Sequence, residues 1–541
     1  MKRQRLSKYD GRPMPTAADV IVRHLQRAGT RALFGVPGGG GNLDLVAAAG
    51  RAGLRFVLTA TETAAAIAAS AQAEITGAPG ACLTTLGPGA ASVVNGVAAA
   101  FLDRVPLVVF TDSMSAADRT LYEHQRIDQT ALLGGVTKSS ESLRLENLDE
   151  QFMTGLLRAR AFPPGPVHFD CPGDLLKQPI ANGPRASHAA LFGSVWPSAH
   201  YDVRHARKPL VIAGLGARRD ADAVAIRKLC ERRAIPAMVT YKAKGVVPDD
   251  HPWFAGVFTN GAIEQPLAKD SDLIIGIGLD PVELLPRPWP YTTPVVSFGR
   301  WPHATEHVPF AAQESREVAE AAAELEAALP ESVWSNAAIA QHRERQRDAV
   351  RIPASGLTAD AVVEIAAARL ASRARVTVDA GAHMLPATTL WPVREPNGLL
   401  ISNGLSTMGF ALPAAIGAAL LNRDRPVVAL TGDGGLLMCA GELLTAARER
   451  LRIIVIVFND ASLSLIEIKQ QARRLDPAGV ALGDVDWAML AASMGVTGFK
   501  AHDRRTLSHA LDQAATVDGP ALIDVRIDRS NYGAMLKEIR G

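Results

Sequence analysis

The sequence predicts an α/β protein made of three doubly wound parallel-sheet domains. Its length is the first observation, since 541 residues exceed what one hydrophobic core can organise and suggest about three ordinary domains. The second is that segments with a helical period alternate with short apolar runs. The third is that some runs, such as residues 453–458, are apolar throughout, as in parallel strands buried on both faces. Together these patterns predict helices on both faces of parallel sheets.

Changes in pattern and composition give the expected domain boundaries. The first fifteen residues are basic but lack the apolar segment of a secretory signal, so we expect a disordered tail. A stretch rich in Gly, Pro, Ser, Ala and His indicates a linker, and a charge-rich helical stretch indicates a connector with a solvated face. The expected layout is tail 1–15, first domain 16–185, linker 186–207, central domain 208–330, connector 331–356 and third domain 357–541.

Composition excludes several classes of function. The 57 Lys and Arg residues nearly balance the 55 Asp and Glu residues, which gives no reason to expect nucleic acid or an anionic membrane as partner. No apolar run reaches the roughly 18 residues that a membrane-spanning helix needs. The four cysteines are scattered without a CxxC pair, which argues against a disulfide framework or a zinc site. We therefore expect a cytoplasmic protein.

The first domain begins with an amphipathic helix over residues 16–28, for which Thr16 is a suitable N-cap. An alanine-rich helix is expected over 64–76, and another should follow the turn Gly87-Pro88-Gly89. Strands are expected at 32–36, 55–59, 81–85, 107–111 and 167–170.

Glu62 is the informative residue of the first domain. A carboxylate at a helix start is favoured by the helix dipole, which is the ordinary interpretation. However, its neighbours along the chain are Ala, Ile and Ser, and no cation follows in the next turn to pair with it. A carboxyl group in such an apolar setting can exchange a proton with a ligand.

The central domain begins with a strand at 209–213 and the turn Gly214-Leu215-Gly216-Ala217. This turn is a fragment of a dinucleotide fingerprint that lacks the third glycine, so it is weak evidence for a nucleotide site. A nicotinamide-dependent dehydrogenase is therefore a poor interpretation, and it leaves residues 431–464 unexplained. Further elements are expected at 220–233 and 262–268 (helices) and at 237–240 and 273–278 (strands).

The third domain carries polar residues directly after apolar strands. A strand at 427–430 leads into Gly432-Asp433-Gly434-Gly435, a helix is expected over 436–449, and the strand at 453–458 delivers Asn459 and Asp460. Because ligands bind at the carboxyl ends of neighbouring parallel strands, Asp433 and Asp460 should face one crevice. Two carboxylates beside a glycine turn suit a divalent ion that holds a diphosphate, although Asp and Asn are also common turn formers. After residue 525 we expect a short tail.

These motifs resemble those of the thiamine diphosphate enzymes. Their signature is GDG followed about two dozen residues later by Asn-Asn or Asn-Asp, and residues 404–413 are similar to the family string G-T-M-G-F-x-L-P. The segment around Glu62 and Gly87-Pro88-Gly89 also matches. The resemblance covers roughly residues 16–530 and is closest to the acetolactate synthase-like group. It implies a pyrimidine-binding, a central and a diphosphate-binding domain.

The resemblance implies a cofactor site of thiamine diphosphate and Mg²⁺. Asp433, Asp460 and the Ser462 carbonyl would ligate the metal, and Glu62 would hydrogen-bond the N1′ atom of the aminopyrimidine. Met408 would hold the cofactor bent, which makes its activating proton transfer intramolecular. The remaining residues implied to bind the cofactor are Gly381, His383, Ser406, Gly432, Gly434, Gly435 and Leu463.

Substrate residues are implied where the chain departs from its relatives. Lys469 stands where acetolactate synthases that make branched-chain precursors carry tryptophan, so we expect a different substrate. Gln125, in a polar loop that could also be merely solvated, and Glu467 are the candidate catalytic residues on the substrate side, with Leu465 and Ile466 beside Glu467. Residues 279–283 lack the arginine of the family's flavin motif, which argues against FAD in the central domain. Thr61 stands where related enzymes place a histidine.

The resemblance implies an enzyme that decarboxylates a 2-oxo acid and either ligates the carbanion to a second carbonyl or protonates it. Protonation alone would make it a simple decarboxylase of the benzoylformate decarboxylase type. A catalytically idle binding or regulatory subunit is a further alternative, against which the joint presence of Glu62, Asp433 and Asp460 argues. Relatives pair the first domain of one subunit with the third of another, which implies a homodimer or homotetramer with shared active sites.

Overall fold

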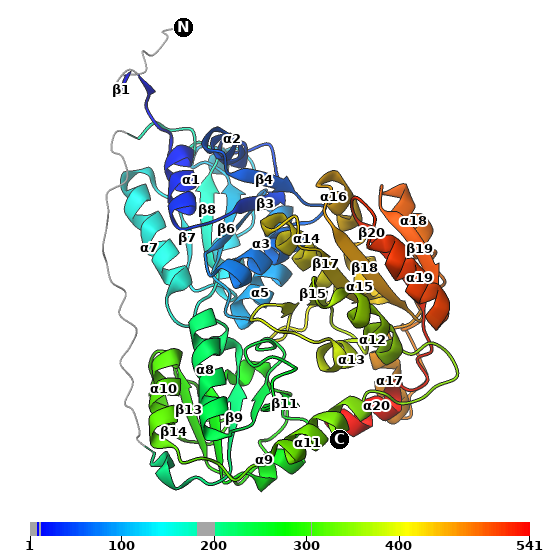
Figure 1. Cartoon of the computed structure of the whole chain (residues 1–541). Helices are drawn as coiled ribbons and strands as arrows, with labels where there is room; N and C mark the ends of the chain where they lie inside the picture. Colours follow the sequence, from blue (N-terminus) through cyan, green and yellow to red (C-terminus); the bar gives the residue numbers. More distant parts are fainter. Residues whose placement is uncertain (1–7, 10–11, 181–200, 305) are drawn as a thin grey trace. The chain divides into compact units, whose positions relative to one another are not determined.

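The computed structural model describes residues 8–9, 12–180, 201–304 and 306–541, and it confirms the predicted fold class. Three six-stranded sheets are present, and every strand in them runs parallel to its neighbours. The chain divides into two compact units. One holds the first sheet together with residues 416–421, and the other holds the second and third sheets (Figure 1).

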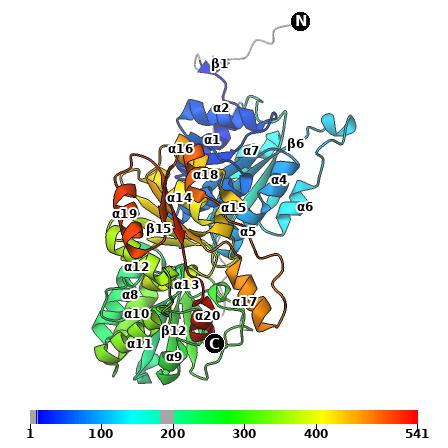
Figure 2. The ribbon, with the colours of Figure 1, turned by 90° about the vertical axis from the view of Figure 1, so that its right-hand side faces the viewer.

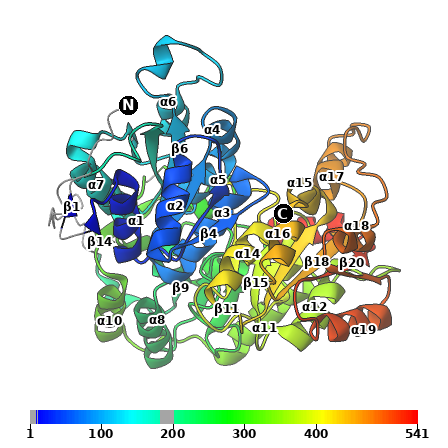
Figure 3. The same ribbon diagram turned by 90° about the horizontal axis from the view of Figure 1, so that it is seen from above.

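The first sheet has the strand order β4-β3-β5-β6-β8-β7. Because β4 and β5 flank β3, the strand order reverses between β3 and β5. The two faces of the sheet have separate cores, one under α1, α2 and α7 and the other under α3 and α5. Figure 3 shows α1 and α2 side by side on one face. The strands are β3 (Ala32–Val36), β4 (Arg55–Leu58), β5 (Gly80–Thr84), β6 (Leu107–Ser113), β7 (Ser140–Ser142) and β8 (Val167–Pro172).

Local sequence signals fix the helices of this unit. Thr16 caps α1 with a reciprocal capping box to Asp19, as its sequence position predicts. Thr61 caps α3, which therefore begins at Glu62, two residues before the expected start, and ends at Gly77 with φ +70°. The helices are α1 (Ala17–Arg27), α2 (Asn42–Ala52), α3 (Glu62–Thr76), α4 (Pro88–Ser92), α5 (Val94–Leu102), α6 (Gln129–Gly134) and α7 (Leu148–Arg160).

The second sheet has the order β11-β10-β9-β12-β13-β14, with its reversal between β9 and β12. Helices α8 and α10 cover one face, and α9 and α11 contribute to the core on the other. The strands are β9 (Pro209–Ala213), β10 (Ala237–Val239), β11 (Phe254–Val257), β12 (Leu273–Ile277), β13 (Val295–Gly299) and β14 (Phe310–Ser315), and the helices are α8 (Asp220–Arg233), α9 (Gln265–Asp270), α10 (Val318–Ala328) and α11 (Asn336–Asp348).

The third sheet has the order β16-β15-β17-β18-β20-β19, and its reversal lies between β15 and β17. Helices α17 and α20 pack against each other, orange and red in Figure 2. The strands are β15 (Arg375–Val378), β16 (Leu399–Ile401), β17 (Val427–Gly432), β18 (Ile453–Asn459), β19 (Thr497–Ala501) and β20 (Ala521–Arg526). The helices are α12 (Ala359–Leu370), α13 (Met384–Leu390), α14 (Ala411–Leu421), α15 (Asp433–Cys439), α16 (Glu442–Arg448), α17 (Ser464–Ala472), α18 (Trp487–Ser493), α19 (Arg504–Ala514) and α20 (Tyr532–Arg540).

Several elements differ from the expectations. The helix expected over 436–449 is two short helices, α15 and α16, separated at Ala440 and Gly441, and α15 already begins at Asp433. The C-terminal tail is instead helix α20, whose buried Tyr532 and Met535 anchor it to the core. Within the expected disordered tail, residues 8–9 and 12–13 pair as the antiparallel strands β1 (Lys8–Tyr9) and β2 (Arg12–Pro13), because backbone pairing needs no apolar pattern. Most of the expected linker, residues 186–200, lies outside the described residues.

No helix in the described part of the chain combines the length and apolar character needed to cross a membrane.

Candidate functional site

The two predicted metal-binding carboxylates follow neighbouring strands of the third sheet. Strands β17 and β18 are in register, with Gly432 opposite Phe458, so Asp433 and Asp460 emerge at the same edge. This edge adjoins the reversal point between β15 and β17, where parallel sheets open a crevice. The sheet register therefore brings together two residues that lie 27 positions apart in the chain.

Asp433 and Asp460 are held by backbone and hydroxyl donors. The Asp433 carboxylate accepts hydrogen bonds from the N–H groups of Gly434 (2.8 Å) and Ala461 (2.6 Å). Asp460 accepts from the Ser462 N–H (3.1 Å) and the Ser464 hydroxyl (2.6 Å). Burial, and then the charge of Asp460, raise the pKa of Asp433 to about 6, and burial raises that of Asp460. Two crowded, partly buried carboxyls of this kind favour a cation between them.

The turn that carries Asp433 has no room for larger residues. A Cβ on Gly434 would lie 2.7 Å from Leu463 Cδ2, and one on Gly435 would lie 2.5 Å from Asp379 Oδ2. The Met408 methyl group lies 3.5 Å from the same Gly434 position, so Met408 reaches over the turn. Glycine is required here because the neighbouring side chains approach the backbone itself.

Asp379 joins three segments of the site. It follows β15, is fully buried, and accepts hydrogen bonds from the Thr431 hydroxyl (2.9 Å) and from the N–H groups of Gly409 (3.1 Å) and Phe410 (3.2 Å). It thereby fixes the loop that carries Met408 to the end of β17. Burial raises the pKa of Asp379 to about 6, against the effect of these donors.

His383 is buried beside the turn. Its ring stacks on Phe458 with 4.9 Å between centroids, and burial lowers its pKa to about 4, so the ring is neutral at physiological pH. Its Nε2 atom is buried and has no hydrogen-bond partner among the described residues. An unpartnered buried ring nitrogen costs stability unless a ligand uses it. His383 is therefore placed to bond an anionic ligand at the turn.

These residues line one cavity of about 540 Å³ in the second unit. All of the residues predicted to bind the cofactor border it: Gly381, His383, Ser406, Met408, Gly432, Asp433, Gly434, Gly435, Asp460, Ser462 and Leu463. Ser406 lies in the left-handed region at φ +54°, so the loop before Met408 has a conformation that few residues adopt without support. The structure thus gathers the predicted cofactor residues around a single space.

The substrate-side candidates on α17 separate in the structure. Leu465, Ile466 and Lys469 line the cavity, whereas Glu467 is outside the lining. Glu467 accepts a hydrogen bond from the Ser462 hydroxyl (2.7 Å), which holds its pKa below the usual range, and pairs with Arg529. Glu467 therefore does not line this cavity, because Ser462 and Arg529 hold its carboxylate, and its role toward the substrate stays a prediction.

Some cavity residues were missed by sequence reasoning. Tyr241 and Thr259 follow the ends of β10 and β11, which is the signal that could have identified them. Residues 282–286 form a further wall, and Tyr532 and Arg540 contribute from α20, which the sequence left as a tail. Unlike Tyr241 and Thr259, residues 282–286, Tyr532 and Arg540 do not directly follow a strand, so the sequence does not mark them as part of a site.

Glu62 and Gln125 lie on either side of one turn in the first unit. A Cβ on Gly89 would lie 3.1 Å from Glu62 Oε1, and one on Gly87 would lie 2.6 Å from the Gln125 carbonyl oxygen. Gln125 has φ +61° and borders a polar cavity of about 730 Å³. The predicted catalytic glutamate and glutamine are therefore neighbours of the Gly87-Pro88-Gly89 turn.

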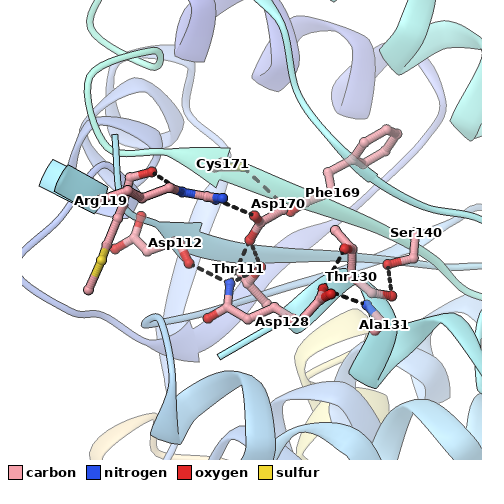
Figure 4. A network of polar contacts seen from close by, with 12 residues as sticks. Thr111, Asp112, Arg119, Asp128, Thr130, Ala131, Ser140, Phe169, Asp170 and Cys171 are labelled. Atoms are coloured by element: carbon pink, nitrogen blue, oxygen red, sulfur yellow. Dashed lines mark hydrogen bonds and ion pairs between the residues drawn. The ribbon is translucent and has the colours of Figure 1, made fainter. Parts of the chain in front are cut away.

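Gln129, which the sequence did not single out, holds this turn to the sheet. Its side-chain oxygen accepts the Gly87 N–H (2.7 Å), and its amide nitrogen donates to Asp170 (2.6 Å) and to the Asp112 carbonyl (2.8 Å). Figure 4 shows Asp112 and Asp170 on adjacent strands, with Thr111 donating to Asp170 at 2.8 Å. The network connects the turn near Glu62 with the ends of β6 and β8.

The donor set of the second-unit cavity fits a hard divalent cation and a diphosphate. Two carboxylates and backbone carbonyl oxygens are ligands that Mg²⁺ accepts, with water or phosphate oxygens completing its shell. Among the described residues no group of three or more His, Cys, Asp and Glu side chains could hold a metal ion, so a metal at Asp433 and Asp460 would need further ligands of these other kinds. The unpartnered His383 nitrogen and the glycine turn are the features that suit a diphosphate.

Family models of thiamine pyrophosphate enzymes match three parts of the chain. Residues 15–132 match the N-terminal TPP binding domain, residues 201–304 the central domain and residues 379–525 the C-terminal TPP binding domain. The third match contains the strand ends that carry Asp379, Asp433 and Asp460, and the first contains Glu62 and Gln125.

Full-length relatives agree with the family models. A catabolic acetolactate synthase from Raoultella terrigena is 30% identical, over 94% of this chain and 95% of that protein. An acetolactate synthase from Bacillus subtilis is 28% identical, over 95% and 93% of the two chains. A probable 2-ketoarginine decarboxylase from Pseudomonas aeruginosa is 29% identical, over 94% of each. The chain therefore belongs to the thiamine diphosphate-dependent enzymes and is an acetolactate synthase-like lyase or transferase of that family.

Proposed function

We propose that the enzyme binds thiamine diphosphate through Mg²⁺ and decarboxylates a 2-oxo acid, with ligation of the remaining fragment to a second carbonyl as the acetolactate synthase-like outcome. The observation that carries this proposal is the pair formed by Asp433, within the glycine turn, and Asp460, which line a cavity together with His383 and Met408. Bound thiamine diphosphate supplies a carbon nucleophile for the 2-oxo group and an electron sink as carbon dioxide leaves.

The residues of the chain divide the remaining work. Asp433, Asp460 and the Ser462 carbonyl hold the metal, and the neutral His383 ring bonds the diphosphate. Glu62 exchanges a proton with the cofactor's N1′ atom, and Met408, which reaches over the glycine turn, supports the bent cofactor. Gln125 lies against Gly87 of the turn whose Gly89 adjoins Glu62, and it serves as the candidate contact to substrate.

The side of the cavity that is lined by residues 284–285 and by α17 suits a 2-oxo acid whose side chain contacts both apolar and cationic groups. Leu284, Leu285, Leu465 and Ile466 offer apolar surface, and Lys469 offers an ammonium group. Two of the related enzymes are named acetolactate synthases, and a third is named a probable 2-ketoarginine decarboxylase. A simple decarboxylase is therefore the second candidate function.

The proposal extends to assembly and location. We place the enzyme in the cytoplasm, where a reducing environment would keep its four buried cysteines as free thiols.

Each active site would take Glu62 from one subunit and the metal-binding cavity from its partner, in a homodimer or homotetramer. Co-expression of Glu62→Gln with Asp433→Ala tests this assembly, because mixed dimers would contain one intact site. Activity in the mixture, with none in either variant alone, is the expected result, and inactivity of a verified mixed dimer would contradict sharing.

The activity itself is tested by a screen of 2-oxo acids, alone and with aldehyde or 2-oxo acid acceptors, with products identified by mass. Release of carbon dioxide with a ligated product is expected when thiamine diphosphate and Mg²⁺ are both present. An aldehyde product in the presence of every acceptor would favour the simple decarboxylase. Failure of every 2-oxo acid in a cofactor-loaded preparation would contradict the proposed function.

A further inference from the structure

The central domain has its own reversal point, at which an open parallel sheet ordinarily holds a nucleotide. Strand β9 is flanked by β10 and β12, so the crevice opens between the carboxyl ends of β9 and β12. The turn after β9, Gly214-Leu215-Gly216-Ala217, lies where related folds offer backbone N–H groups to a diphosphate, but the N–H groups of Gly214, Gly216 and Ala217 donate to backbone carbonyls here. The acetolactate synthase-like resemblance places a flavin in this domain, so the fit of this crevice decides whether one binds.

A carboxylate of the chain already occupies this turn. Glu283 ends the short 3₁₀ segment after β12 and is 5% exposed. Its Oε2 atom accepts the Leu215 N–H at 2.8 Å, and its Oε1 atom accepts the Thr240 hydroxyl at 2.6 Å, from the end of β10. Burial raises the pKa of Glu283 to about 7, although both hydrogen bonds oppose that shift. Glu283 therefore takes the acceptor position that a phosphate oxygen would take.

The surrounding backbone leaves no space beside this carboxylate. A Cβ on Gly214 would lie 2.5 Å from Leu279 Cα and 2.9 Å from Glu283 Oε2. Gly278, at φ +61°, approaches so closely that its own Cβ would lie 2.5 Å from the Ala217 nitrogen. The Gly216 N–H donates to the Gly278 carbonyl at 2.9 Å. The two strand ends are thus in direct contact where a dinucleotide would have to pass.

Two arginines beside this turn are also engaged, and the first, Arg218, donates its Nε–H to the Leu215 carbonyl at 2.9 Å. Arg300, after β13, donates to the Gly216 carbonyl (2.9 Å) and forms ion pairs with Asp222 and Glu317, both at 2.8 Å. Its side chain is 4% exposed, so a phosphate would have to displace two carboxylates to reach it.

Glu283 also connects the central domain to the cofactor cavity. Its backbone carbonyl accepts the Asn403 side-chain N–H at 3.1 Å, and Asn403 borders the cavity beside Ser406. Residues 282–286, which include Glu283, form a wall of that cavity. The side chain of Glu283 thereby holds this wall at a fixed position relative to β9 and β10.

We propose that the central domain binds no flavin or other dinucleotide, because Glu283 fills its phosphate position, and that Glu283 acts instead as a positioning residue for the substrate-side wall at 282–286. The first half is independent of the proposed function, whereas the second half rests on it. An experiment can therefore contradict the statement about flavin without contradicting the positioning role of Glu283, and the reverse.

The first half is tested on the purified full-length protein. We expect no absorbance near 450 nm, no flavin released by denaturation, and no change in FAD fluorescence when FAD is titrated against wild-type protein. Stoichiometric flavin, retained or acquired, would overturn this half. The flavin content can be measured whether or not thiamine diphosphate binds. A failure of the proposed function would therefore not affect this test.

The second half is tested by Glu283→Ala and Glu283→Gln, with KM and kcat measured for the best 2-oxo acid. We expect Glu283→Ala to raise KM by about tenfold with a smaller change in kcat, because the wall at 282–286 loses its anchor. Gln retains an acceptor for the Leu215 N–H and a donor for the Thr240 hydroxyl, so it should recover most of the lost affinity.

Gln346→Ala is the matched control. Gln346 is a buried acceptor for the Val257 N–H in the same unit (2.9 Å), and it does not line the cavity. It should lower Tm without changing KM. A Glu283→Ala variant that loses only Tm and keeps the wild-type KM would overturn the positioning role. Should Glu283→Ala fail to fold, an unchanged KM together with a lowered Tm in Glu283→Gln would do the same.

Discussion

Asp433 accepts the backbone N–H of Asp460 at 3.2 Å, so the second carboxylate of the predicted metal site is positioned by the first. Loss of the Asp433 carboxylate removes a metal ligand and also frees the residues that carry Asp460. We expect Asp433→Ala to weaken thiamine diphosphate binding by at least about 100-fold in the presence of Mg²⁺. Titration followed by tryptophan fluorescence measures this, and wild-type affinity in a folded variant would contradict the metal assignment.

Glu62 should control activation of the cofactor without controlling its binding. Glu62→Gln keeps the helix start at Thr61 but cannot exchange a proton with the aminopyrimidine. We expect exchange of the thiazolium C2 proton to slow by about two orders of magnitude or more, the usual contribution of a positioned acid or base. Quenched-flow deuterium exchange monitored by NMR gives the rate. An unchanged rate with bound cofactor would refute the role.

Lys469 should influence which 2-oxo acid is used. Its exposed ammonium group borders the cavity and can attract a carboxylate on the substrate. Lys469→Met should lower kcat/KM for 2-oxo acids with a second, distal carboxylate by about fivefold, corresponding to roughly 1 kcal/mol for a solvent-accessible ion pair. Apolar 2-oxo acids serve as the comparison series. Equal losses for both series would assign Lys469 a role other than charge recognition.

Asp112 should make the stability of the first unit depend on pH. It is 1% exposed, and burial, followed by the charges of Asp170 and Asp44, raises its pKa to about 7 from 3.8. Between these values the folded protein keeps a proton that the unfolded chain has released, so the free energy of unfolding falls as pH rises through this window.

Asp112→Asn cannot titrate and retains an acceptor for the Asn42 N–H. We expect it to be more stable than wild type near pH 8, by about 4 kcal/mol at most, and to converge with wild type near pH 4. Tm measured across this range for both proteins tests the difference. Parallel curves would show that Asp112 is not the group responsible.

Gly435 should tolerate no side chain. Its Cβ would meet the Asp379 carboxylate at 2.5 Å, and Asp379 fixes both the Met408 loop and the end of β17. Gly435→Ala should destabilise the protein by about 1 to 3 kcal/mol and weaken cofactor binding. Gly50→Ala, in α2 with open space around its Cβ, is the control and should be neutral or slightly stabilising. Equal behaviour of the two variants would contradict the packing argument.

The convergence of the candidate cofactor residues on one cavity could be predicted because sheet geometry places them. Asp433, Asp460 and His383 each follow a strand of the third sheet, and parallel register brings such residues to one edge whatever their separation in the chain. The spacing between the two aspartates was therefore sufficient to infer a site. The three-domain α/β fold was predictable for the same reason, since buried parallel strands are continuously apolar.

The substrate-side wall could not be predicted in this way. Glu283 and its neighbours reach the cavity through a hydrogen bond to the turn at Leu215, 68 residues earlier, which no local pattern encodes. Arg540 contributes from a helix whose amphipathic pattern was overlooked at the chain end. The sequence also gives no sign that Glu467 pairs with Arg529, 62 residues later, and this pair keeps its carboxylate out of the cavity lining.

The cavity wall at 282–286 is separate from the strand ends that carry Asp433 and Asp460. This separation affects how substrate preference can diverge among related enzymes. The residues proposed to hold the cofactor are fixed by hydrogen bonds at the strand ends of the third sheet, and a shift there would disturb the contacts of Asp379 with Thr431, Gly409 and Phe410. The segments proposed to meet the substrate are the loop at 282–286 and the first turns of α17, neither of which belongs to a sheet. New substrate preferences can therefore arise by replacing a handful of side chains in those two segments, while the apparatus for cofactor activation is inherited intact.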